Sequence, residues 1–90
     1  MFYVYLLESK KDKDFYIGST NNLRKRLVEH NSGKVQSTAH RKPFVLLYYE
    51  AYLEEGDART RESSLKLRGQ ARVYLLRRIP GSIELSRNDT

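Results

Sequence analysis

The stretch "FYIGSTNNLRKRLVEH" (Phe15 to His30) begins as a strand and ends as a basic helix. Its first residues are aromatic or β-branched, which favours a strand, whereas "STNN" supplies side chains that cap helix N-termini. "SG" at Ser32 and Gly33 is typical of a helix end, so we predict a helix from about Asn22 to Asn31. The strand and the helix therefore follow one another without a long loop.

A second strand precedes this stretch. "FYVYLL" (Phe2 to Leu7) is rich in aromatic and β-branched residues, and the polar segment "ESKKDKD" separates the two strands. Strands this close in sequence are expected to pair antiparallel. If the hairpin is symmetric about Lys10 and Lys11, Tyr5 lies directly opposite Tyr16, and opposite residues share a face. Both phenols are then predicted to point the same way.

The rest of the chain supplies one further strand and two further helices. "PFVLLYYEAYL" (Pro43 to Leu53) has an unbroken apolar run, which predicts a third strand at the centre of the sheet. A helix capped at Asp57 is expected to run to about Leu67, and "ARVYLLRRI" forms another that ends at Pro80. The predicted fold class is α+β, a three-stranded antiparallel sheet flanked by about three helices in the order β-β-α-β-α-α.

Length and composition restrict the classes of protein and of site. Ninety residues form one small domain, expected over residues 1–81. Residues 82–90 are expected to form a loose tail, unless Ile83 and Leu85 dock on the domain. The chain has no cysteine and two histidines, so a thiolate site, a disulfide and a His-built zinc site are excluded, and oxygen would hold any metal. No apolar run approaches the roughly 18 residues of a membrane span, and signal-peptide features are missing. A cytosolic (cytoplasmic) protein, monomeric by default, is expected.

The charge balance indicates the class of partner. Lys and Arg number 17 against 11 Asp and Glu, which gives a net charge of +6. Such an excess is typical of proteins that meet phosphates, although many small basic domains are merely solvated.

Two polar residues lie beside the apolar positions of the first helix. On a helical wheel Leu23 and Leu27 define the buried side, and Arg26 and His30, four residues apart, stack along its edge. One interpretation is structural: the Arg26 stem covers the core edge and His30 makes a local hydrogen bond. The other is that both residues belong to a site.

The second helix carries a carboxylate where an apolar residue is expected. Glu62 falls between Ala58 and Leu65, which mark the inner stripe. Carboxylates avoid the interior unless a cation, a metal or strong donors hold them, so Glu62 needs a partner. An ion pair with Arg26 would supply one. The alternative is a site in which the tyrosine pair, the Arg–His pair and Glu62 meet, where both helices are expected to cover the same face of the sheet.

Such a set suits phosphodiester hydrolysis. One carboxylate can hold Mg²⁺, which keeps most of its waters and takes further oxygens from a phosphate. Arginine offers a planar fork to phosphate oxygens. A tyrosine can orient or deprotonate a water, provided that a cation lowers its pKa from about 10.

These motifs occur together in a known family. "YVY" (Tyr3 to Tyr5), "YIG" (Tyr16 to Gly18), "NLRKRLVEH" and "RESSLKLRG" resemble the GIY-YIG nuclease superfamily, especially its small bacterial stand-alone members, over about residues 2–79. The resemblance implies a three-stranded antiparallel sheet with flanking helices. It also implies an endonuclease that cleaves DNA at one Mg²⁺ or Mn²⁺ ion, in the manner of DNA-repair nucleases.

The resemblance also implies a role for each matching residue. Tyr5 would be the general base or would position the water, and Tyr16 would hold the water network. Arg26 matches the catalytic arginine, and His30 would orient the water or bind the phosphate. Glu62 matches the metal-binding glutamate.

One further match and two departures complete the comparison with the family pattern. Gly18 lacks a side chain, which would let the next helix or the substrate approach closely. The first tripeptide, Tyr3 to Tyr5, lacks the family's glycine and isoleucine but keeps its second tyrosine. A late polar residue, usually Asn, has Asn88 in the predicted tail as its only candidate.

Three functional hypotheses follow. The leading one is an endonuclease that recognises DNA structure rather than sequence, since no recognition module is appended. In this hypothesis Arg24, Lys25 and Lys66 contact the DNA backbone, although Lys66 could instead be a solvated surface residue. The alternative is a non-catalytic, basic nucleic-acid-binding module on the same scaffold. A protein-interaction domain would instead use exposed tyrosines of the third strand, namely Tyr48, Tyr49 and Tyr52.

Overall fold

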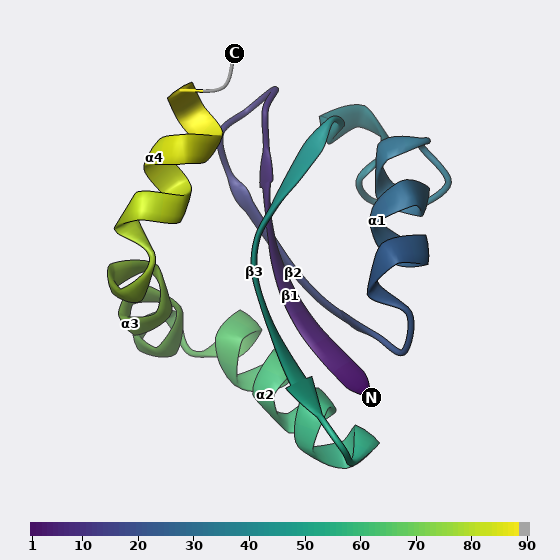
Figure 1. Ribbon diagram of the computed structural model, residues 1–90, viewed down its shortest axis with the longest axis vertical. Helices are drawn as coiled ribbons and strands as arrows, with labels where there is room; N and C mark the ends of the chain where they lie inside the picture. Colours follow the sequence, from purple (N-terminus) through teal and green to yellow (C-terminus); the bar gives the residue numbers. More distant parts are fainter. Residues whose placement is uncertain (89–90) are drawn as a thin grey trace.

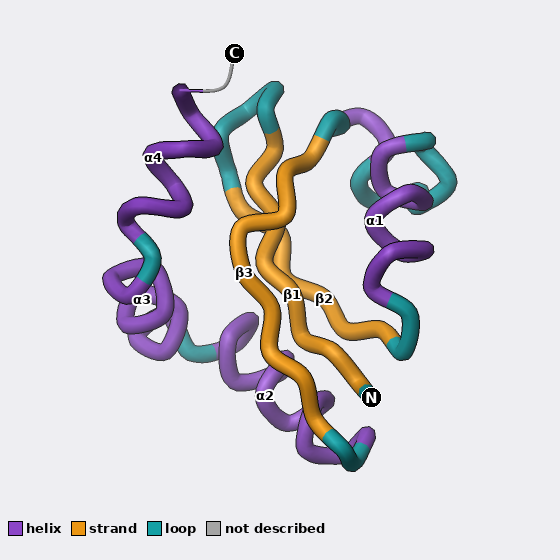
Figure 2. The backbone as a smooth tube through the Cα atoms, viewed as in Figure 1, coloured by secondary structure: helices purple, strands orange, loops and turns teal. Residues whose placement is uncertain are grey.

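A three-stranded antiparallel sheet in the order β2-β1-β3 runs through the middle of the molecule (Figure 1). The computed structural model describes residues 1–88. Its strands are β1 (Phe2–Ser9), β2 (Phe15–Thr20) and β3 (Phe44–Tyr52). On one side of the sheet lies α1 (Leu23–Asn31); on the other lie α2 (Glu55–Leu67), α3 (Gly69–Arg78) and α4 (Pro80–Asn88) (Figure 2). The α+β fold with a three-stranded antiparallel sheet is therefore confirmed.

The central strand is β1, so the prediction that the third strand occupies the centre is wrong. From Val4 to Ser9 every residue of β1 is buried. In β3 the second half alternates, and Tyr49 exposes 53% of its surface. An unbroken apolar run marks a strand that is covered on both faces, but both β1 and β3 carry such a run. The tyrosines of β3 are the reason for the error, because an aromatic residue can also lie at a surface.

Successive residues of β1 serve opposite faces of the sheet. One face and the helices α2 and α3 enclose the main hydrophobic cluster of Val4, Leu6, Ile17, Ala58, Leu65 and Leu75. The other face and α1 enclose a smaller cluster around Tyr5, Leu7 and Phe44, with Leu23 and Leu27 from the helix. The predicted inner stripes of the first and second helices are therefore confirmed.

The pairing of β1 with β2 differs from the prediction by two residues. Tyr5 lies opposite Gly18, and Tyr16 lies opposite Leu7, so the two tyrosines are not direct partners. A shift of two residues leaves each side chain on its face, because strand side chains alternate with period two. Both phenols therefore still point the same way, as predicted, and the structure places them on the side that α1 covers.

The turn between β1 and β2 explains the shift. The Ser9 amide donates to the Asp14 carbonyl, and the Lys13 amide donates to the Ser9 carbonyl. Lys13 has φ 62°, in the left-handed region. The centre of the hairpin consequently lies one residue further along the chain than a hairpin centred on Lys10 and Lys11.

The N-terminal cap of α1 is the predicted one, whereas the cap of α2 is not. The Asn22 side chain accepts from the Lys25 amide and caps α1, as predicted. In α2 the cap is Glu54, whose carboxylate accepts from the Asp57 amide, so the prediction of a cap at Asp57 is wrong.

Within residues 1–88 no helix combines the length and apolar character needed to cross a bilayer.

The loose tail predicted from residue 82 is wrong as far as residue 88, where α4 packs on the sheet. Glu8 of β1 is 1% exposed and accepts hydrogen bonds from Ser86 Oγ and Arg87 Nε, both at 2.9 Å. A buried carboxylate needs such donors. Because polar contacts hold α4 on the sheet, the spacing of its apolar residues did not predict a docked helix. Residues 89–90 of the predicted tail lie outside the described part of the chain.

The docking of α4 can be tested with Arg87→Ala. The substitution leaves the buried Glu8 carboxylate with Ser86 as its remaining donor, and we expect the free energy of unfolding in urea to fall by about 1–3 kcal/mol. Arg59→Ala is the control, since Arg59 and Glu55 form an exposed pair that should contribute less than about 1 kcal/mol. Equal losses in the two variants would show that the Glu8 contact does not hold α4.

Candidate active site

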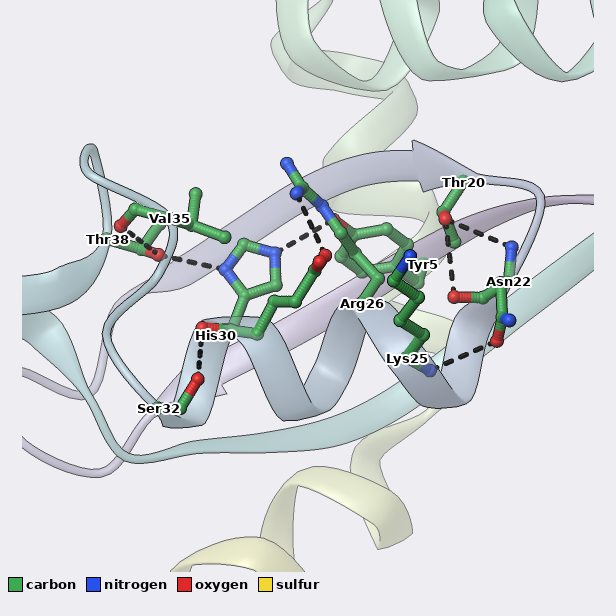
Figure 3. Close-up of polar contacts among 10 residues, drawn as sticks. Tyr5, Thr20, Asn22, Lys25, Arg26, His30, Ser32, Val35 and Thr38 are labelled. Carbon is green, nitrogen blue, oxygen red and sulfur yellow. Dashed lines mark hydrogen bonds and ion pairs between the residues drawn. The ribbon is translucent and has the colours of Figure 1, made fainter.

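A buried chain of hydrogen bonds joins three elements on the α1 side of the sheet (Figure 3). The Tyr5 hydroxyl lies 2.9 Å from His30 Nε2, and His30 Nδ1 lies 2.8 Å from Thr38 Oγ1. Tyr5, His30 and Thr38 are 2%, 0% and 1% exposed. His30 is therefore held at both ring nitrogens and has no surface of its own.

The direction of this chain follows from its last member. Thr38 Oγ1 donates to the Val35 carbonyl at 3.4 Å, so it accepts from His30 Nδ1–H. His30 Nε2 then carries a lone pair and accepts from the Tyr5 hydroxyl. Burial, followed by the charge of Arg26, lowers the pKa of His30, which keeps the imidazole neutral.

Gly18 makes room for Tyr5. A Cβ atom at Gly18 would lie 2.6 Å from Tyr5 Cζ and even closer to the hydroxyl oxygen. The expectation that the missing side chain admits the next helix or the substrate is wrong, because the ring of Tyr5 on the neighbouring strand fills that space. The Tyr5 ring therefore lies over Gly18 of the neighbouring strand β2.

Tyr16 joins the same aromatic group. Its ring centroid lies 5.0 Å from that of His30 and 6.4 Å from that of Tyr5. Lys66 Nζ of α2 lies 6.0 Å from the Tyr16 ring centroid. Since α2 covers the opposite face of the sheet, Lys66 reaches Tyr16 around the edge strand β2.

Tyr5 is a protonated donor in this setting. Burial raises the pKa of Tyr5 to about 12, although the neighbouring Arg26 acts in the opposite direction. Tyr16 and Glu62 also raise this pKa through their charges. Among the side chains present, Arg26 is therefore not sufficient to bring the phenol below its ordinary pKa.

Arg26 and Glu62 have separate partners, so the predicted alternative of an Arg26–Glu62 ion pair is wrong. Arg26 Nη1 lies 3.3 Å from Glu29 Oε1, and the Arg26 side chain is 37% exposed. Glu62 Oε1 accepts from Ser19 Oγ at 2.7 Å, and Oε2 lies 2.8 Å from Lys66 Nζ. The expectation that Glu62 needs a partner is confirmed.

Both charged groups nevertheless act on the same hydroxyl. The pKa of Tyr5 responds to Arg26 from α1 and to Glu62 from α2. Ser19, the partner of Glu62, follows Gly18 in β2 and points to the other face of the sheet. Tyr5, Tyr16, Arg26 and His30 thus lie on the α1 side of the sheet, whereas Glu62 lies on the α2 side next to Ser19, so the prediction that both helices cover one face is wrong.

The donor set fits a hard cation bound by one carboxylate. In residues 1–88 no cluster of three or more metal-ligating side chains occurs. Glu62 is ionised: burial opposes its charge, but Lys66 and Ser19 outweigh that effect and lower its pKa. The Lys66 ammonium already places a cation on this carboxylate. A Mg²⁺ ion that keeps most of its waters could take that position in exchange.

The predicted backbone-binding residues fall into two groups. Arg24 and Lys25 are exposed on α1, and neither has an ion pair within the described part of the chain. Lys66 is 46% exposed and paired with Glu62, so it is not simply solvated. Asn88 is exposed at the end of α4, far from α2 (Figure 1), and does not join the site.

Sequence reasoning missed Thr38 and Ser19. Thr38 lies in the polar loop before the 3-10 turn Ala39–Arg41, where no periodicity predicts which side chains are buried. Ser19 could have been found, because it shares a strand face with the buried Ile17 and so points toward α2.

The chain is similar to proteins of known sequence and to one solved structure. Residues 1–75 match the GIY-YIG catalytic domain family. A UPF0213 protein of Streptococcus pyogenes serotype M5 is 43% identical over 67 residues, which cover 73% of this chain and 72% of that protein. The solution NMR structure of a UPF0213 protein from Bacillus halodurans has a TM-score of 0.55 and 31% identity, and covers 93% of this chain and 94% of that one.

The role of Gly18 is testable with Gly18→Ala. The added methyl group forces the Tyr5 ring away, so we expect the Tyr5–His30 hydrogen bond to break and stability to fall by about 1–3 kcal/mol. NMR of the His30 ring nitrogens and thermal unfolding measure the two effects. Gly81→Ala, where nothing lies within 4 Å, should change neither the ring signals nor stability unfavourably. An unshifted His30 spectrum in Gly18→Ala would contradict the packing argument.

The neutral state of His30 predicts a pH dependence. Its pKa is lowered in the folded protein, so below about pH 6.5 the unfolded chain binds more protons and stability falls as the pH falls. The slope from this group is at most about 1.4 kcal/mol per pH unit. Urea unfolding at several pH values should show this slope in the native protein and lose it in His30→Gln. An NMR titration midpoint of His30 above 6.5 would contradict it.

Proposed function

The chain belongs to the family of GIY-YIG catalytic domains, and from that premise we propose that it is a metal-dependent endonuclease that hydrolyses DNA phosphodiester bonds. The observation that carries the proposal is the hydrogen bond between the buried Tyr5 hydroxyl and His30, with Arg26 on the same side of the sheet and Glu62 bound to Ser19 of β2. The proposed cofactor is one Mg²⁺ or Mn²⁺ ion at Glu62. The proposed setting is a cytoplasmic monomer that acts on DNA.

Tyr5 passes a proton from the attacking water to His30. The Tyr5 oxygen accepts a proton from the water while its own proton moves to His30 Nε2 across the 2.9 Å hydrogen bond. A free phenolate would be costly because the pKa of Tyr5 is about 12. The coupled transfer avoids it, since the phenol is neutral before and after the step.

His30 receives the proton as the acceptor of this relay. Its ring is surrounded by the rings of Tyr5, Tyr16 and Phe44, with centroids at 5.8, 5.0 and 5.7 Å. These edge-to-face contacts hold the ring in place. Because burial and Arg26 lower the pKa of His30, the imidazolium is a short-lived state that readily gives the proton up again. Thr38 accepts from Nδ1 and so keeps Nε2 free for the proton. Thr38 is accordingly a positioning residue, and full burial excludes the direct phosphate contact considered for His30.

Arg26 and Glu62 act on the phosphate. Arg26 pairs with Glu29 and interacts with the Tyr5 hydroxyl, and its remaining guanidinium donors are available to the phosphate oxygens and to the charge that builds in the transition state. An ion held by Glu62 would withdraw charge from a phosphate oxygen and acidify a bound water. Lys66, next to Glu62 and Tyr16, adds a further cation at the same edge.

The proposed substrate is DNA recognised by structure rather than by sequence. The net charge of +6 and the exposed Arg24 and Lys25 attract the phosphate backbone without reading bases. The same charges would also support the second hypothesis, a non-catalytic binding module, so an activity measurement has to separate the two.

The proposal is tested by cleavage of supercoiled and branched DNA with Mg²⁺ or Mn²⁺. We expect Glu62→Gln and Arg26→Ala each to lower the rate by at least about 10²-fold, because each removes charge stabilisation from the transition state. Glu55→Gln is the matched control, an exposed carboxylate on the same helix, and should leave the rate unchanged.

Two outcomes would contradict the endonuclease proposal. Equal cleavage by the native protein and Glu62→Gln would assign the activity to a contaminant or to another site. Salt-sensitive DNA binding with no cleavage in either metal would identify the non-catalytic module instead.

A further inference from the structure

An aromatic groove lies on the other flank of α1 from Arg26. It is open to solvent, has a volume of about 470 Å³, and is lined chiefly by Tyr3, Tyr49, Leu23, Leu27 and Arg24. Tyr3 and Tyr49 come from β1 and β3, so the floor is sheet and the wall is helix. The groove is separate from the Tyr5–His30 chain.

Tyr49 presents an aromatic surface in this groove. It is 53% exposed, whereas the neighbouring Tyr48 and Tyr52 pack against the main cluster and donate to Glu50. The rings of Tyr3 and Tyr49 meet at 65° with centroids 5.9 Å apart, which fixes the orientation of Tyr49. A rigid, half-exposed ring of this kind is a platform on which a planar group can stack.

The charge of the groove selects an anionic ligand. Arg24 is the only charged residue in its lining, and in residues 1–88 it has no ion pair. Asn21 and Asn22 add amide groups at one end. An aromatic platform beside an unpaired guanidinium and amides matches a nucleotide, which has a planar base and a phosphate.

The groove also communicates with the candidate active site. Asn21 and Asn22 line both the groove and a second hollow that contains Ser19, Lys25 and Arg26. The two hollows therefore meet at the N-terminus of α1. A strand whose phosphate lies at Arg26 can continue past these asparagines to Arg24 and Tyr49.

We propose that this groove binds an unpaired nucleotide that flanks the scissile phosphate, with its base stacked on Tyr49 and its phosphate at Arg24. The inference rests on the proposed nuclease function and specifies its substrate class. Bases in an intact duplex are stacked on each other and cannot enter the groove. The protein then favours single-stranded segments and flaps over continuous duplex DNA.

The test is metal-free binding of a labelled oligothymidylate and of a blunt duplex of equal length, followed by fluorescence anisotropy in EDTA. Tyr49→Ser should weaken single-strand binding roughly tenfold and leave duplex binding unchanged, because one stacking contact is lost. Tyr49→Phe keeps the ring and should retain the native affinity. Tyr74→Ser is the control, since Tyr74 is equally exposed, at 54%, but lies on α3.

The proposal is overturned if Tyr49→Ser binds the single strand as well as Tyr74→Ser does, or loses affinity for both forms of DNA equally. Thermal unfolding of each variant establishes that it is folded. Because the assay contains no metal, its result is independent of cleavage. A protein that passes the binding test but cuts no DNA would remove the endonuclease proposal and leave the groove assigned.

Discussion

The burial of β1 on both faces is the constraint on which the rest of the structure depends. Successive side chains of a strand point to opposite faces, so a central strand must satisfy two environments at once. Val4 and Leu6 pack into the main cluster under α2 and α3, while Tyr5 projects to the α1 side. Alternate residues of this one strand thus serve two purposes: those on one face form the hydrophobic core, and Tyr5 on the other face belongs to the candidate site.

Because strand side chains alternate with a period of two residues, the sequence predicts which residues share a face more reliably than it predicts which residues of β1 and β2 lie opposite each other. The hairpin register was wrong by two residues, but an even shift leaves Tyr5 and Tyr16 on the same face. Helical spacing likewise placed Arg26 and His30 on one side of α1, independently of the sheet order. The central position of β1 was not predictable in the same way, because two strands have apolar runs.

The parts that sequence reasoning missed are held by polar contacts rather than by periodic apolar ones. α4 is fixed by Ser86 and Arg87 on Glu8, and the loop residue Thr38 is buried only because His30 bonds to it. Such contacts join residues far apart in the chain, and no local pattern reports them. The partner of Glu62 is a different case, because Lys66 lies four residues further along the same helix, a spacing that helical periodicity does report.

The close approach of Gly18 to Tyr5 has a consequence for how this sequence can change. The steric conflict is with Cβ, an atom that every amino acid except glycine possesses, so it does not depend on the chemistry of the side chain. The restriction comes from the neighbouring ring, so a residue other than glycine at position 18 requires the Tyr5 ring to move or residue 5 to become smaller. Position 18 is therefore restricted by the size of its neighbour and not by any chemical role of its own.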